Sequence, residues 1–188
     1  MFRKLTPAQL AVDIVVPAFL ALFGLWVQLP GDTGPALVIL GMAGALVFWR
    51  WSPGLALGIA WFVALAQVAA DIPPHFSNLA ILGVLYGTGA YGNRMVRWLG
   101  FASTFVGAAV ITVSVVLPDV LSQLIVADLS AVFSLRGAVV GAFLVFVTAS
   151  VAFLLSWTSG VLWSTWMRSR ANRRAAVAAA REVAAEQE

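Results

Sequence analysis

Residues 137–167 read GAVVGAFLVFVTASVAFLLSWTSGVLWSTWM, and residues 168–183 follow as RSRANRRAAVAAAREV. The first run is long and apolar enough for a membrane helix, and no proline lies between Gly137 and Glu188. The second run is rich in Ala, Arg and Glu, which are strong helix formers. The sequence therefore predicts one membrane helix that continues into water as a polar rod. We expect this rod to carry a conformational change to an output domain outside this sequence.

The composition of the whole chain is also typical of a membrane protein. Hydrophobic residues make up 62% of the chain and charged residues only 10%, whereas charged residues are about 25% of a soluble domain. At about 20 residues per span, a chain of 188 residues holds five or six membrane helices and no soluble catalytic domain. We therefore expect an all-α fold, a polytopic bundle of about six transmembrane helices.

The apolar runs place the expected spans. They cover residues 9–28, 34–50, 53–70, 78–93, 98–117 and 137–167. The fourth run is short and rich in glycine, so it needs local thinning of the bilayer or snorkelling ends. The last would extend about 46 Å against a hydrocarbon core of about 30 Å, so it must tilt or protrude.

The basic residues orient these spans, because Lys and Arg accumulate in short cytoplasmic segments. With six spans, all of them except Arg136 fall on one side, which predicts cytoplasmic termini in a bacterial plasma membrane. The side is marked by Arg3, Lys4, Arg50, Arg94, Arg97, Arg168, Arg170, Arg173, Arg174 and Arg181. The net charge of +3 follows from this rule, so we expect membrane lipids and not nucleic acid as partners.

Two segments on the outer side are candidates for receiving a signal. Residues 118–136 place apolar residues at helical spacing, with Asp128 among the polar ones, which predicts an amphipathic helix in the outer interface. This helix either packs over the bundle or senses a lipid or ligand. The other loop holds Asp71 and His75, the only histidine. That histidine either responds to pH or metal, or has no functional role.

Two polar residues are expected inside the membrane part, where polar groups are costly and tend to face partners. Asp13 lies near the inner end of the first span, and Gln67 lies in the third. Asp13 either has a partner in the bundle or stays hydrated near the inner headgroups. We treat both residues as candidate sensing residues.

The rod carries the residues that we expect to transmit the signal: Trp163, Trp166, Arg170, Arg173 and Val177. From Trp166 onward these follow a coiled-coil spacing that Ala180 and Ala184 continue, but two arginines at core positions make a weak coiled coil. A homodimer is expected, and Gly137 with Gly141 could let two copies of the last span approach closely.

The sequence contains no catalytic constellation. It has no Gly-x-Ser-x-Gly, no phosphate-binding loop, no histidine cluster and no cysteine. This chain is therefore not expected to be an enzyme or to bind a cofactor or metal. An alternative to a sensor is a self-contained small polytopic membrane protein, either a transporter subunit or a membrane scaffold.

Several boundary motifs carry a family resemblance. They are Asp13 in the first span, Val47-Phe-Trp49-Arg50-Trp-Ser-Pro53, Gln67 followed by Ile72-Pro-Pro74, and the run from Leu85 to Trp98. Together with the tail, they resemble the N-terminal multi-pass sensor region of bacterial NarL/DesK-type two-component histidine kinases. Trp51-Ser52 departs from the family, which often has more Arg there.

The resemblance implies a function for the complete protein. In that family the last span leads through a helix into a dimerisation helix with the phosphoacceptor His, and then into an ATP-binding domain. It implies autophosphorylation with ATP and Mg, phosphoryl transfer to a response regulator, and control by the membrane part. In this chain, residues 168–188 would be the cytoplasmic signalling helix, and the kinase core lies outside the sequence.

Overall fold

The computed structural model describes residues 7–28, 33–125 and 131–186, and these residues are helical almost throughout. They form six α-helices and one short 3-10 helix. In chain order these are α1 (Pro7–Gln28), α2 (Thr33–Val47), α3 (Pro53–Ala69), η1 (Phe76–Leu79), α4 (Ala80–Tyr91), α5 (Arg94–Ile125) and α6 (Ala131–Glu186). The all-α expectation is therefore confirmed.

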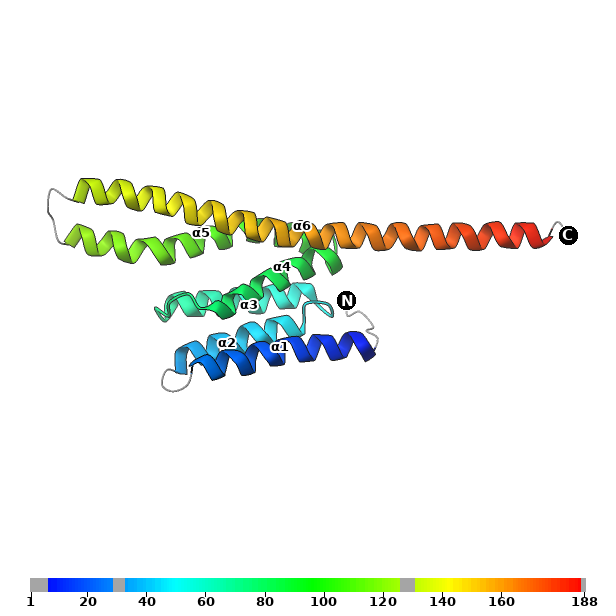
Figure 1. Cartoon of the computed structure of the whole chain (residues 1–188), viewed down its shortest axis with the longest axis horizontal. Helices are drawn as coiled ribbons and strands as arrows, with labels where there is room; N and C mark the ends of the chain where they lie inside the picture. The colour runs from blue at the N-terminus through cyan, green and yellow to red at the C-terminus, as the bar shows by residue number, and fades with distance from the viewer. Residues whose placement is uncertain (1–6, 29–32, 126–130, 187–188) are drawn as a thin grey trace.

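The helices form a layered bundle from which α6 projects (Figure 1). α6 packs against α4 and α5, α2 packs against α1 and α3, and contacts from α3 and α2 to α4 join the two groups. The 56 residues of α6 extend about 84 Å at 1.5 Å per residue. The red end of this helix runs far past every other helix (Figure 1).

The turns at one end of the bundle follow from local sequence signals. Pro53 lies at the start of α3, where its missing N–H costs no helical hydrogen bond. Asn93 caps α5, because its Oδ1 accepts a hydrogen bond of 2.8 Å from the backbone N–H of Val96. These two turns lie at the same end of the bundle as the exit of α6 (Figure 1). We call it the basic end, since Arg50, Arg97 and Arg168 all lie there.

α4 and α6 approach each other closely where they cross. A Cβ added at Gly160 would collide with the backbone of Tyr86 and Ala90, and one added at Gly89 would collide with the backbone of Trp157. Only glycine permits backbones to come this close. The crossing lies near the basic end and fixes α6 against α4 just before the polar rod begins.

Three of the helices are long and apolar enough to cross a membrane. The qualifying segments are Gln9–Gln28, Arg94–Pro118 and Arg136–Glu182. α2 and α3 are apolar but have 15 and 17 residues, and α4 has 12. Large apolar side chains face outward on most of the helices, for example Phe19, Phe62 and Leu155. An outward apolar surface of this extent is compatible with a lipid environment.

The separate amphipathic helix expected over residues 118–136 is not found as such. α5 continues through Pro118 to Ile125, and α6 begins at Ala131. Pro118 removes only one helical hydrogen bond, the one to the carbonyl of Ser114, and membrane helices tolerate such a loss. The second expected run also ends earlier, because Trp49 and Arg50 lie in the turn after α2.

Candidate functional site

Asp13 lies on the face of α1 that packs against the rest of the bundle. The buried positions of this helix are Asp13, Pro17 and Gly24, which recur at helical spacing, whereas most other side chains of α1 are exposed. Pro17 has no N–H, so it cannot bond to the backbone carbonyl of Asp13 four residues earlier. Asp13 therefore places a carboxyl side chain on the inner face of a largely apolar helix.

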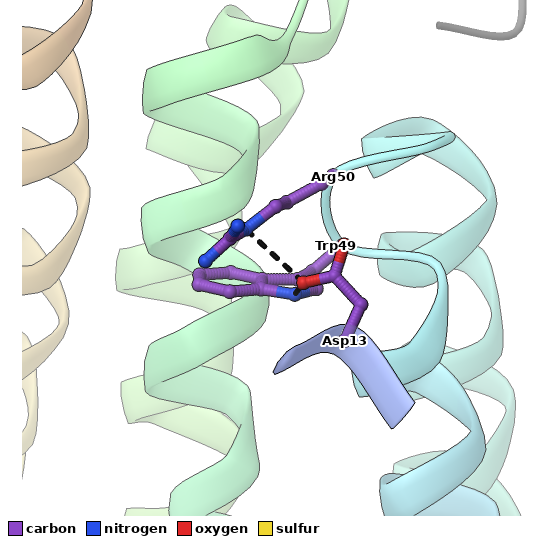
Figure 2. Close-up of polar contacts among 3 residues, drawn as sticks. All are labelled: Asp13, Trp49 and Arg50. Atoms are coloured by element: carbon purple, nitrogen blue, oxygen red, sulfur yellow. Dashed lines mark hydrogen bonds and ion pairs between the residues drawn. The ribbon is translucent and has the colours of Figure 1, made fainter. Parts of the chain in front are cut away.

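The partners of Asp13 come from the turn after α2 (Figure 2). Trp49 Nε1–H donates a hydrogen bond of 2.8 Å to Asp13 Oδ1, and Arg50 Nε lies 3.1 Å from the same oxygen. The Arg50 guanidinium also lies over the Trp49 ring, 4.6 Å from its centroid. The Asp13 side chain is only 2% exposed. Of the two alternatives for Asp13, the structure favours a partner within the bundle.

One oxygen of this carboxylate remains unsatisfied. Asp13 Oδ2 is buried and has no hydrogen-bond partner in the described part of the chain. Burying a charged oxygen without a partner is costly. The cluster of Asp13, Trp49 and Arg50 therefore ties α1 to the α2–α3 turn through one carboxylate oxygen only.

An open cavity of about 810 Å³ lies next to this cluster at the basic end. Its walls come from the N-terminal part of α1, the α2–α3 turn, α4, the start of α5 and the stretch of α6 where the rod begins. They include Gln9, Trp49, Arg50, Tyr86, Arg97, Ser156, Trp163, Ser164 and Arg168. Three arginines from three separate segments thus share one cavity, and the signal-transmitting candidate Trp163 lines it.

Polar contacts hold α6 to its neighbours at the level of this cavity. Arg97 Nη2 donates a hydrogen bond of 2.9 Å to Ser164 Oγ, and Trp157 Nε1–H donates one of 3.2 Å to the Arg97 carbonyl. Ser156 Oγ donates a hydrogen bond to the carbonyl of Leu82 on α4. Residues 156–164 are therefore the anchored part of α6, and the exposed rod follows directly.

Gln67 lies at the opposite end of the bundle and organises the α3–η1 connection. It is 4% exposed. Gln67 Nε2 donates a hydrogen bond of 2.9 Å to the Pro73 carbonyl, and Asn78 Nδ2 donates one of 3.0 Å to Gln67 Oε1. A cavity of about 80 Å³ adjoins Gln67 and Asn78. Since small-molecule sites measure about 300–1,000 Å³, this cavity is too small to hold one.

The remaining outer-loop candidates have local roles or lie outside the description. His75 caps η1, with its Nδ1 3.5 Å from the backbone N–H of Ser77. Asp71 is exposed and has a φ of 53°, in the left-handed region that Asp tolerates better than most residues. Asp128 lies outside the described residues. The structure places Gln67, Asp71 and His75 at one end and Asp13 at the other, so they do not form one site.

The rod residues beyond the cavity are exposed. Trp166 lies beside Trp163 with ring centroids 5.2 Å apart and the rings tilted by 37°, and the Arg170 guanidinium lies 3.6 Å from the centre of the Trp166 ring. Arg173 and Val177 are exposed on the helix surface. These residues are all on α6, as expected, and their role in transmission stays a prediction.

Comparison with protein-family models, with curated proteins and with solved structures finds no match to this chain. The family resemblance described above therefore rests on the sequence motifs alone.

Arg50 and Asn78 were not identified as partners from the sequence, although a signal for each was present. Arg50 was expected at the same end as Asp13, and opposite charges in an apolar bundle tend to pair. Asn78 was expected at the start of the span 78–93, and Gln67 near the end of the span 53–70, so both were expected on the same side. What the sequence could not provide was the distance between helices, which depends on side-chain packing across the whole bundle.

Proposed function

We propose that this chain is the membrane-embedded input part of a two-component sensor histidine kinase. The observation that carries the proposal is the continuity of α6, which forms part of the bundle at one end and an exposed helical rod at the other. An unbroken helix transmits rotation or translation over its length. The motifs that resemble the NarL/DesK-type sensor region are the reason to propose a histidine kinase as the output domain.

The proposed topology has six crossings and two cytoplasmic termini. Three helices are long enough to cross by themselves. α2, α3 and α4 with η1 would cross where the bilayer thins around them or where their ends are covered by the longer helices. The basic end would face the cytoplasm, since Arg50, Arg97 and Arg168 lie there.

The proposed mechanism is a change in the rotation or tilt of α6. Residues 156–164 are held by α4 and α5, so a shift of these helices moves the rod that follows. The helices differ widely in length, from 12 to 56 residues, so bilayer thickness acts on them unequally. A stimulus changes the state only as far as it favours one arrangement over the other.

Cysteine cross-linking along the rod tests this mechanism, since the chain has no native cysteine. Single cysteines at positions 163–184 would be oxidised in vesicles of short-chain and long-chain phosphatidylcholine. We expect disulfides to peak at Trp166, Arg170, Arg173, Val177, Ala180 and Ala184, and to change in yield with bilayer thickness. An absence of cross-links, or one pattern that stays the same in every bilayer, contradicts a moving dimeric rod.

The kinase half of the proposal has its own test. In the native gene, the DNA downstream of the codon for Glu188 would be sequenced. An open frame encoding a helix with an acceptor His and an ATP-binding domain supports the proposal. An immediate stop codon contradicts it and favours the transporter subunit or scaffold.

A further inference from the structure

The cavity at the basic end has the size and chemistry of an anion site. Its volume of about 810 Å³ lies in the usual range of small-molecule sites. Arg50, Arg97 and Arg168 line it, and Asp13 is the one carboxylate that the described residues place beside it. Asp13 pairs with Arg50 alone, so the charge of the other two arginines is not neutralised.

Arg97 and Arg168 have donors to offer a ligand. Arg97 uses Nη2 to bond Ser164, whereas its Nε is buried and has no partner in the described part of the chain. Arg168 is exposed and lines the same cavity as Arg97. An anion bound between two guanidinium groups offsets their mutual repulsion, and guanidinium binds phosphate oxygens in a bidentate manner.

The walls of the cavity favour a lipid over a soluble anion. Leu82, Met167 and Trp163 form apolar wall next to the arginines. Trp163 and Trp166 lie where the apolar part of α6 gives way to the polar rod, which is the depth of lipid headgroups. A ligand with a charged head and an apolar body matches both parts, and basic pockets between membrane helices bind anionic lipid headgroups.

We propose that this cavity binds the phosphodiester headgroup of an anionic phospholipid through Arg97 and Arg168. The inference rests on the membrane placement proposed above and does not depend on a kinase core. Since Ser164 and Trp163 belong to the anchored part of α6, a bound headgroup would hold α6 at the point where the rod leaves the bundle.

Native mass spectrometry of the purified full chain in nonionic detergent tests the proposal. Equal amounts of a phosphatidylglycerol and a phosphatidylcholine with the same acyl chains would compete for the protein. We expect retained phosphatidylglycerol to exceed phosphatidylcholine by about tenfold or more, as one or two charge-assisted contacts provide. R97Q/R168Q should reduce this ratio to about one, and R97K/R168K should keep part of it.

Two further variants separate loss of binding from loss of fold. Arg168→Gln changes an exposed side chain and should lower the ratio about three- to tenfold while the protein stays monodisperse. Arg136→Gln removes the same charge at the opposite end of α6 and should leave the ratio unchanged. Equal loss in both variants overturns the proposal, because the selectivity would then follow net charge and not the cavity.

Inorganic phosphate distinguishes the source of the anion. Phosphate at low millimolar concentration should leave bound phosphatidylglycerol in place. Displacement at that concentration shows a soluble-anion site and overturns the lipid proposal, as does equal retention of the two lipids by the unmodified protein. None of these outcomes affects the cross-linking test of α6, so failure of lipid binding and failure of the proposed function are distinguishable.

Discussion

Asp13 and Arg50 form the one ion pair among the described residues. Either side chain without the other would be a charge that lacks its partner. Removing one partner of a buried pair strands a charge in an apolar surrounding. Arg50 is 19% exposed and can recover part of its hydration. The cluster is therefore best regarded as a specific tie between α1 and the α2–α3 turn, not as a large source of stability.

Asp13→Asn should lower the free energy of unfolding by about 1–3 kcal/mol, less than for a fully buried pair. Asn keeps an oxygen that accepts from Trp49 but removes the charge that faces Arg50. Thermal unfolding in detergent, followed by circular dichroism, measures the change. Asp71→Asn is the matched control, since Asn also tolerates the left-handed region and Asp71 is exposed. An equal loss in both variants would contradict a specific tie.

Gln67 and Asn78 should be energetically coupled, because each side chain provides a partner for the other. Gln67→Leu and Asn78→Leu should each destabilise the protein by about 1–2 kcal/mol, since each leaves a polar group unpaired. The double variant should cost about 0.5–1.5 kcal/mol less than the sum of the two. Thermal unfolding of all four proteins closes the cycle, and strict additivity would show that the hydrogen bond contributes nothing.

At the scale of the elements, the α4–α6 crossing depends on a single glycine on each helix. Gly160→Val would force the backbones of α4 and α6 apart, because its Cβ has no free space. We expect a loss of about 2 kcal/mol or more, as for overpacking of a core. Gly137→Val is the control on the same helix, since nothing lies within 4 Å of a Cβ there.

The unfolding midpoints of both variants would be measured in detergent. A lower midpoint for Gly160→Val than for Gly137→Val supports the importance of the crossing. If Gly137→Val is as destabilising as Gly160→Val, the cost does not come from the crossing, because a Cβ at position 137 meets no neighbouring atom and Val has a higher helix propensity than Gly. A cost at Gly137 that appears only in bilayers, together with loss of cross-linking, would instead place that glycine at a dimer contact.

The sequence predicted the helical elements better than their ends and contacts. Apolar runs and glycine or proline punctuation are local signals, so α1, α3 and the continuous α6 lie close to the expected ranges. The 118–136 segment was expected to be a separate amphipathic helix from its apolar spacing, but that spacing does not show where one helix ends, and α5 continues through Pro118 to Ile125. The cavity at the basic end could not be predicted, because it depends on how three segments distant in sequence come together.

At the scale of the whole molecule, the bundle and the rod differ in what fixes them. Residues 156–164 are held by hydrogen bonds to α4 and α5, whereas the side chains from Arg168 to Glu182 are exposed. An isolated exposed helix of this length is only marginally stable. The rotation of the rod is therefore expected to be set by the bundle and not by the rod itself.

Insertion of two alanines after Val177 tests which part sets the rotation. Two residues turn the rest of the helix by about 200°. If the bundle sets the rotation, cross-linking upstream at Trp166 and Arg170 stays unchanged. The downstream maxima then move from Ala180 and Ala184 to Ala178 and Glu182, which now occupy the same positions in space. If the rod sequence sets its own pairing, the maxima stay at Ala180 and Ala184, and the upstream cross-links weaken instead.

An insertion of seven residues is the control. It restores the rotation of the helix to within about 20° and should return the original cross-linking pattern in either case. If the original pattern does not return, the insertion has broken the helix.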